Sequence, residues 1–232
     1  MDMISADYLI VNGVSSETFG LWIDTPPVPP MARQRVTTWQ TGIDMDDAAP
    51  DDTWENITLN FAAYVFFRSG DFDLSAVYAF LADAKTLEIS RFSGRFFKVR
   101  QLSGITPQAQ YDGQRIKISL QFICAPFKYH TTNPENTPSG TIENPGTRYS
   151  RPVYKIEHSG GCTLTVNGEV LTISAGASSP IFVDAARMIA YNSAGENQTK
   201  FTAGNFPFLQ PGINTISTTG TALTVTGNWR DY

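Results

Sequence analysis

The sequence predicts a mainly β protein that carries one α-helix, and three observations support this fold class. First, apolar and polar side chains alternate along QRIKISLQFIC, residues 114–124, which is typical of a strand with one face in a core. Second, DFDLSAVYAFLADAK, residues 71–85, has the i, i+3, i+4, i+7 apolar spacing of a helix. Third, Asn167 and Gly168 lie between two alternating runs, a pattern that predicts a two-residue type I′ hairpin turn.

The composition favours a folded protein that does not grip nucleic acid. Of the 232 residues, 41% are apolar and 17% are charged, and the formal net charge is −5. Such a chain can bury a core, and its charge is opposite in sign to that of most nucleic-acid-binding domains. The acidic start MDMISADYLIV lacks the basic region of a signal peptide, and the longest apolar run, FAAYVFF, is too short to span a membrane. Cys124 and Cys162 have no metal-type spacing, so we interpret both as buried thiols of a protein made in a reducing compartment.

We expect an N-terminal β domain over residues 1–130. The alternating ENITLNF, residues 55–61, predicts a strand that continues into AAYVFF, where the loss of alternation predicts that both faces are covered. The single helix is predicted near residues 73–85, about three turns, with Asp73 as its N-cap. Its buried stripe consists of four apolar residues: Leu74, Val77, Tyr78 and Leu81. Strands TLEIS and RFFKVR follow the helix, and in the second we expect Phe97 and Val99 to point inward.

Residues 131–150 hold three prolines and almost no periodicity, so they predict a linker between domains. Residues 151–232 then form a C-terminal antiparallel β-sandwich, for which a jelly roll fits. The step Pro211-Gly212 predicts a type II turn, and Pro207 restricts its own strand to an edge or a bulge. In the closing strand, one face carries Leu223, Val225 and Trp229.

The sequence offers little for catalysis. It contains only two histidines, His130 at the start of the linker and His158 before a turn. No nucleophile elbow, phosphate-binding loop or dinucleotide-binding glycine pattern is present. We therefore expect no enzymatic activity, no cofactor and no metal site.

An acidic segment leaves two interpretations open at this point. DMDDAAPDD could be a calcium-binding loop, because clustered carboxylates are the ligands that hard cations prefer. The EF-hand pattern fails, since its glycine and its final glutamate are out of register, and a plain solvated loop is favoured. The residues concerned are Asp44, Asp46, Asp47, Asp51 and Asp52.

Three other stretches each have a plain interpretation and a functional one. The basic and aromatic RFSGRFFKVR, residues 91–100, could stack single-stranded nucleic acid, but an ordinary strand is favoured. The stretch PPVPP, residues 26–30, predicts a stiff polyproline spacer of about 15 Å. A sugar-binding role needs exposed aromatic side chains; with Trp229 in phase with the core, the candidates in the second half are Tyr149, Tyr154 and Tyr191.

Several short motifs along nearly the whole chain are similar to those of the siphophage distal tail proteins. These are YLIVNGVSSETFGLWI, GRFFKVR, IKISLQFICAPFKY, NPGTRYSRPVYKI and NFPFLQPGINTIS. One departure is TWQTGIDMDD, residues 38–47, which stands where family members often have a Pro-Gly-Arg-Asp-Gly-like turn. Contacts made through that turn are therefore in question.

The resemblance implies an N-terminal domain with one helix and a C-terminal galectin-like sandwich. It further implies a homohexameric ring at the tail tip, which joins the tail tube protein to tail-tip or tail-associated lysin proteins and to receptor-binding proteins. DNA would pass through the ring only in transit. The implied location is the virion, after assembly in the host cytoplasm.

A closed ring needs a heterologous interface, in which one patch meets a different patch on the neighbour. We expect part of that interface in the apolar segment before the proline spacer, at Tyr8, Phe19, Leu21, Trp22 and Ile23. The acidic segment acquires a further hypothesis: if it faces the channel, its carboxylates repel DNA phosphates. The alternative function is a glycan-binding accessory protein that uses the C-terminal sandwich to contact host cell-wall carbohydrate.

Overall fold

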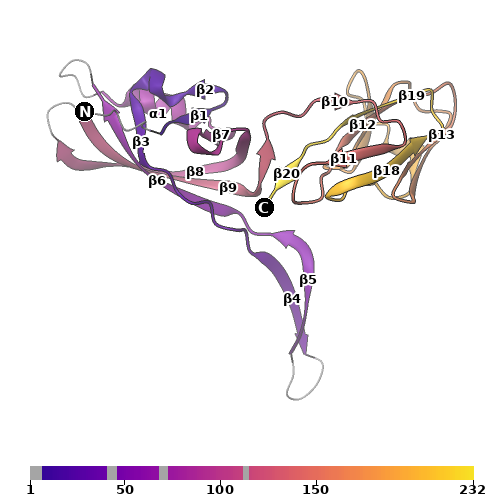
Figure 1. The fold of residues 1–232 in the computed structure, drawn as a ribbon, viewed down its shortest axis with the longest axis horizontal. Helices are drawn as coiled ribbons and strands as arrows, with labels where there is room; N and C mark the ends of the chain where they lie inside the picture. Colours follow the sequence, from indigo (N-terminus) through magenta and orange to yellow (C-terminus); the bar gives the residue numbers. More distant parts are fainter. Residues whose placement is uncertain (1–6, 41–45, 68–72, 112–114) are drawn as a thin grey trace. The chain divides into compact units, whose positions relative to one another are not determined.

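A computed structural model describes residues 7–40, 46–67, 73–111 and 115–232 (Figure 1). Its contacts divide the chain into two compact units, residues 1–128 with Tyr232 and residues 129–231. Both units consist mainly of antiparallel strands, and among the described residues there is one α-helix. The predicted fold class is therefore confirmed.

The second unit includes the residues that we predicted as a linker. Within 131–150, β10 (Glu135–Asn136) pairs with β19 (Ala222–Thr226), and β11 (Thr141–Asn144) pairs with β18 (Gly212–Thr218). The prolines that suggested a linker lie outside these two short strands. Residues 131–150 thus contribute an edge strand to each sheet of the second unit.

The first unit is built on one curved sheet with the strand order β2-β1-β7-β8-β9-β6-β3 (Figure 1). Asp7, just before β1, forms an isolated bridge with Ile23 in β3, so the chain at the start of β1 also lies beside β3. The strands are β1 (Leu9–Val11), β2 (Val14–Ser15), β3 (Leu21–Thr25), β6 (Ile57–Phe66), β7 (Thr86–Ile89), β8 (Arg95–Tyr111) and β9 (Arg115–His130). A single apolar core fills the inside of this unit.

Alternation along the strands supplies that core. In β6 the buried face begins with Ile57, Leu59 and Phe61, as predicted, and continues through Ala63 and Val65. The expected loss of alternation after Phe61 is therefore wrong, because Ala62 and Tyr64 remain on the outer face. In β9 the inward residues are Ile118, Leu120, Phe122 and Cys124, while Ile116 is only partly buried.

The helix α1 (Ser75–Ala82) is shorter than predicted. The prediction of Asp73 as the N-cap is wrong, because the N-cap position is Leu74, but the Asp73 carboxylate still accepts a hydrogen bond of 2.8 Å from the Ser75 N–H of the first turn. Of the predicted stripe, Leu74, Val77 and Leu81 are buried, whereas Tyr78 is exposed. Phe80 instead stacks on Phe19, which lies at the end of the 3₁₀ helix η1 (Ser16–Phe19), with ring centroids 4.4 Å apart.

Strands β4 (Gln34–Gln40) and β5 (Asp46–Trp54) form a two-stranded ribbon (Figure 1). They pair with each other and with no third strand in the described ranges. At the end of β5, the Trp54 ring lies 5.6 Å from Phe127 and 5.5 Å from Tyr232, measured between centroids. The last residue of the chain therefore packs in the first unit.

The second unit is a sandwich of two five-stranded antiparallel sheets, ordered β10-β19-β12-β15-β16 and β11-β18-β13-β14-β17. Its other strands are β12 (Val153–Glu157), β13 (Cys162–Val166), β14 (Glu169–Ile173), β15 (Ile181–Asp184), β16 (Ile189–Asn192) and β17 (Thr202–Ala203). A short strand, β20 (Arg230–Asp231), lies outside these two sheets and pairs with β9. The two sheets share one apolar core that includes Tyr154, Leu223, Val225 and Trp229. The closing strand thus points its predicted face inward.

The turn chemistry of this unit follows the sequence closely. Asn167 and Gly168 have φ values of 49° and 86°, which confirms the predicted type I′ turn between β13 and β14. Gly212 has φ of 83°, as the second central residue of a type II turn requires. Pro207 lies in no strand, and the nearest pairing is an isolated bridge between Leu209 and Ser150.

Candidate oligomer interface

The segment that we predicted as an interface divides between the core and the outer face of β3. Leu21 and Ile23 are 0% and 2% exposed, respectively, and pack in the core of the first unit. Their side chains cannot reach a neighbouring chain without unfolding, so they are removed from the candidate interface. Strand alternation explains the division, because Trp22 between them points the opposite way.

Phe19 and Tyr8 hold the first unit together. The Phe19 ring is partly buried against the core through its stack on Phe80. The Tyr8 backbone is bonded twice to Ser90, whose hydroxyl accepts from the Tyr8 N–H at 3.1 Å and whose N–H donates to the Tyr8 carbonyl at 3.0 Å. Both side chains are only half-buried, so each retains some accessible surface.

Trp22 belongs to a row of side chains on the outer face of the sheet. It lies opposite Tyr64 of β6, and Tyr64 lies opposite Lys117 of β9. The Arg115 guanidinium is 4.8 Å and the Lys117 amine 5.9 Å from the centre of the Tyr64 ring, both within cation–π range. We call these four residues the aromatic row: a cationic and apolar patch on an acidic chain, such as protein interfaces often use.

Beyond the aromatic row the same face forms a groove of about 550 Å³ without charged side chains. Two hydrogen bonds order its polar lining, one of 2.9 Å from Gln121 to Asn60 and one of 3.0 Å from Gln108 to Ser119. The side chains on its outer face are Asn60, Ala62, Ser103, Thr106, Ser119 and Gln121. We call this surface the uncharged groove. The alternation in residues 114–124 placed Lys117, Ser119 and Gln121 on the polar side, but it did not distinguish a site from ordinary solvated surface.

The acidic segment is a strand rather than the predicted loop. Asp46, Asp47, Asp51 and Asp52 lie in β5, where Asp46 is opposite Gln40 and Asp47 opposite Trp39. Asp44 lies outside the described residues, and the side chains of the other four lie outside the described part of the chain as well. Backbone pairing along the ribbon overrides the low strand propensity of aspartate.

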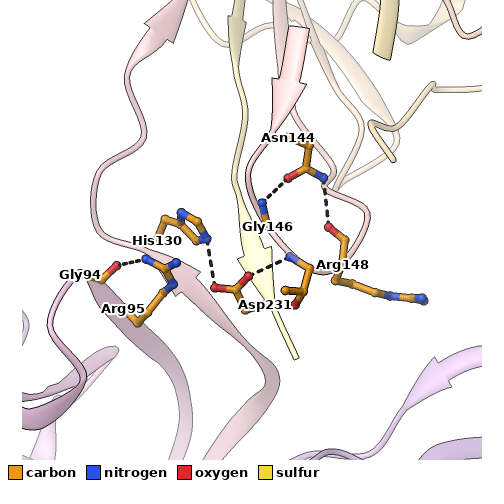
Figure 2. Close-up of polar contacts among 8 residues, drawn as sticks. Gly94, Arg95, His130, Asn144, Gly146, Arg148 and Asp231 are labelled. Atoms are coloured by element: carbon orange, nitrogen blue, oxygen red, sulfur yellow. Dashed lines mark hydrogen bonds and ion pairs between the residues drawn. The ribbon is translucent and has the colours of Figure 1, made fainter. Parts of the chain in front are cut away.

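The two histidines have different surroundings in the second unit. His130 Nε2 lies 3.1 Å from Asp231 Oδ2, and the other oxygen of Asp231 accepts a 2.8 Å hydrogen bond from the Thr147 N–H (Figure 2). Nearby, the Asn144 side chain bonds the Gly146 N–H and the Arg148 carbonyl. These bonds hold β9, β20 and the turn after β11 together. We therefore assign these side chains a structural role. His158 is buried, and its ring nitrogens have no hydrogen-bond partner among the described residues.

Comparison with known proteins reveals a likeness in fold. No family model matches the sequence, and no curated protein matches it. The crystal structure of Dit (gp 19.1) from phage SPP1, titled a paradigm of the hub adsorption apparatus of phages that infect Gram-positive bacteria, is similar with a TM-score of 0.71 and 17% identity. The match covers 94% of this chain and 96% of that chain. Within the described residues, no helix is long and apolar enough to cross a membrane. The chain has the fold of a siphophage distal tail protein.

Proposed function

We propose that this chain is a structural protein of a siphophage tail tip, where it serves as the distal tail component of the hub. The observation that carries the proposal is the fold match, because it covers 94% of this chain and therefore includes both units. SPP1 Dit is a hub of the adsorption apparatus, and we assign the same role to this chain. A hub works by holding other proteins in place, so the proposal includes no catalytic activity.

The hub assembles as a ring of six copies. The β4–β5 ribbon supports self-assembly, because an isolated two-stranded hairpin is only marginally stable in water. The side chains of residues 35–38 in β4 are all exposed, so the ribbon buries neither face of this stretch within its own chain. A ribbon of this kind gains stability when a neighbouring copy covers it, which is how a heterologous contact closes a ring.

The aromatic row is the second contact that we assign to the ring. Trp22 and Tyr64 provide apolar area with few rotatable bonds, and Arg115 and Lys117 provide charge. Aromatic and arginine side chains carry much of the binding energy of protein interfaces. The neighbouring surface that receives them is expected to be acidic, as the net charge of −5 allows.

In this role the ring joins the tail tube protein to tail-tip or tail-associated lysin proteins and to receptor-binding proteins, and it is located in the virion. DNA passes through its channel without being held. The uncharged groove is the surface that suits the channel, because it offers no cation to a phosphate.

Light scattering coupled to size exclusion tests the proposal. Six chains of 25.5 kDa have a mass of 153 kDa, and negative stain should show that species as a ring. A species of 25.5 kDa at every concentration, together with absence of the chain from purified tails by mass spectrometry, would contradict the hub role.

A further inference from the structure

A small cavity opens at one end of the second unit, formed by four segments that are separated in sequence. Its volume is about 240 Å³. Arg151 reaches it from the residue pair before β12, Glu169 from the start of β14, and Met188 from the turn between β15 and β16. Asn205, Phe206 and Phe208 complete it from the irregular segment before β18. Loops that converge at the end of a sandwich are a common place for binding sites.

Met188 and Phe208 form the apolar wall of this cavity, and both side chains are exposed to solvent. Met188 is 62% exposed and Phe208 is 37% exposed. Met188 has φ of 55°, a conformation uncommon for residues other than glycine. The Asp184 carboxylate fixes that turn by accepting hydrogen bonds of 2.9 and 3.0 Å from the N–H groups of Ala186 and Arg187. The turn therefore presents the exposed Met188 side chain in a fixed position.

Phe208 is positioned from both sides. The Tyr154 hydroxyl, deep in the core, donates a hydrogen bond of 3.2 Å to the carbonyl of Pro207. The Tyr149 ring packs beside Phe208 with centroids 5.1 Å apart and an angle of 52° between the ring planes. The aromatic ring in the cavity therefore has a defined orientation before any ligand arrives, which reduces the entropic cost of binding.

Three planar polar groups also line the cavity: the guanidinium of Arg151, the carboxylate of Glu169 and the amide of Asn205. Arginine only donates hydrogen bonds, an ionised carboxylate only accepts them, and an amide does both. Burial, and to a lesser degree the charge of Glu169, raises the pKa of the Tyr154 hydroxyl. Together the three groups can donate hydrogen bonds to the neighbouring hydroxyls of a ligand and accept hydrogen bonds from them.

We propose that this cavity binds one ring of a neutral sugar, with the C–H face of the ring against Phe208 and Met188 and its hydroxyls bonded to Arg151, Glu169 and Asn205. This inference goes beyond the hub role and does not depend on ring formation. An apolar side chain from a partner protein would suit the wall, but it would offer no hydrogen bond to Glu169 or Asn205, and none to Arg151 beyond the 3.4 Å bond that its guanidinium already donates to the Tyr149 hydroxyl. A sugar ring satisfies both kinds of surface.

The test uses the full chain labelled with ¹³C at its methionine methyl groups. The sequence has five methionines; Met31, in the first unit and 68% exposed, serves as an internal control for Met188. The probes are glucose, galactose, N-acetylglucosamine and rhamnose, titrated to about 50 mM because a single-ring site is expected to have a millimolar Kd. N-acetylphenylalaninamide is titrated in parallel as a mimic of a protein side chain.

We expect at least one sugar to shift the Met188 methyl signal in a saturable way while the Met31 signal stays unchanged. Glu169→Gln, on an exposed residue that does not affect folding, should weaken binding by about fivefold or more, since it removes a charged acceptor. Phe208→Ala should weaken binding at least as much, and Ile213→Ser, at an exposed position outside the cavity, should leave the Kd unchanged. If no sugar moves the Met188 signal, or if only N-acetylphenylalaninamide does, the proposal is wrong.

Discussion

Trp22 and Tyr64 lie directly opposite each other on the neighbouring strands β3 and β6. Their side chains share the outer face of the sheet, while the residues on either side of Trp22 are buried in the core. This alternation separates the residues that hold the first unit together from those that are free to contact another chain. The predictions for the two groups are therefore different.

Trp22→Ser is expected to dissociate the ring without unfolding the chain. The substitution removes a large aromatic surface from the outer face and leaves the core of the unit intact. Light scattering should show the 153 kDa species replaced by one of 25.5 kDa, with an unchanged circular dichroism spectrum. Met31→Ser, at an exposed apolar residue outside the aromatic row, is the control and should preserve the ring. An intact ring in the Trp22 variant would remove the aromatic row from the interface.

Phe19→Ala should instead destabilise the first unit. The ring of Phe19 is stacked on Phe80 of α1, so truncation leaves a gap between the helix and η1. We expect a loss of about 2 kcal/mol in the free energy of unfolding, below the range for a fully buried phenylalanine. Urea unfolding followed by tryptophan fluorescence measures it, because three of the four tryptophans lie in the first unit. A free energy equal to that of the unmodified chain would mean that the stack contributes nothing.

Alanine substitutions at Gly13 and Gly20 distinguish the cost of backbone strain from the cost of a steric clash. Gly13 and Gly20 both have positive φ, 82° and 67°. A methyl group on Gly13 would meet open space, whereas one on Gly20 would lie 2.6 Å from the Phe66 carbonyl oxygen. Gly13→Ala should cost about 1 kcal/mol, and Gly20→Ala should cost about 1–2 kcal/mol more. Equal melting temperatures for the two variants would show that β6 can move away from the new methyl group.

Asn214 fixes the Pro211-Gly212 turn from inside the second unit. Its side chain is fully buried and accepts from the Gln210 N–H at 2.8 Å while it donates to the carbonyls of Gln210 and Gly212 at 2.8 and 2.9 Å. Asn214→Ala leaves these groups without partners and should cost about 3 kcal/mol. Amide hydrogen exchange should become faster at Gln210 first. Asn214→Asp is the matched comparison, because aspartate keeps the acceptor oxygen and loses both N–H donors of the side-chain amide.

The two cysteines should be unreactive in the folded chain. Burial raises the pKa of the Cys124 thiol to about 12 and also raises the pKa of Cys162. At pH 8 only about one Cys124 in ten thousand is then a thiolate, the form that reacts. Ellman's reagent should modify neither residue until denaturant is added, and then both. Fast labelling of the native chain would show that one thiol reaches solvent.

Periodic signals in the sequence predicted the long elements of the fold correctly. Strands β6 and β9 and the helix follow from apolar spacing, and the turns at Asn167-Gly168 and Pro211-Gly212 follow from residues that tolerate positive φ. Strands β10 and β11 are too short to have a period of their own. They form only because β19 and β18, far along the chain, provide the pairing.

The candidate sites were harder to predict. The apolar content of residues 8–23 indicated an interface, but core and interface residues have the same composition, and only pairing with β6 shows which face of β3 is buried. The aspartates suggested a loop because their strand propensity is low, a local preference that pairing with β4 overrides. The cavity around Met188 had no sequence signal, because its lining comes from four segments that are separated in sequence.

The position of Tyr232 has a practical consequence for dissecting this protein. Its ring packs with Trp54 and Phe127 in the first unit, although the residue before it belongs to the second. A fragment that ends at residue 128 lacks this aromatic contact, and one that begins at residue 129 starts inside β9. Separate expression of the halves therefore calls for a circular permutant or a grafted aromatic residue rather than a simple truncation.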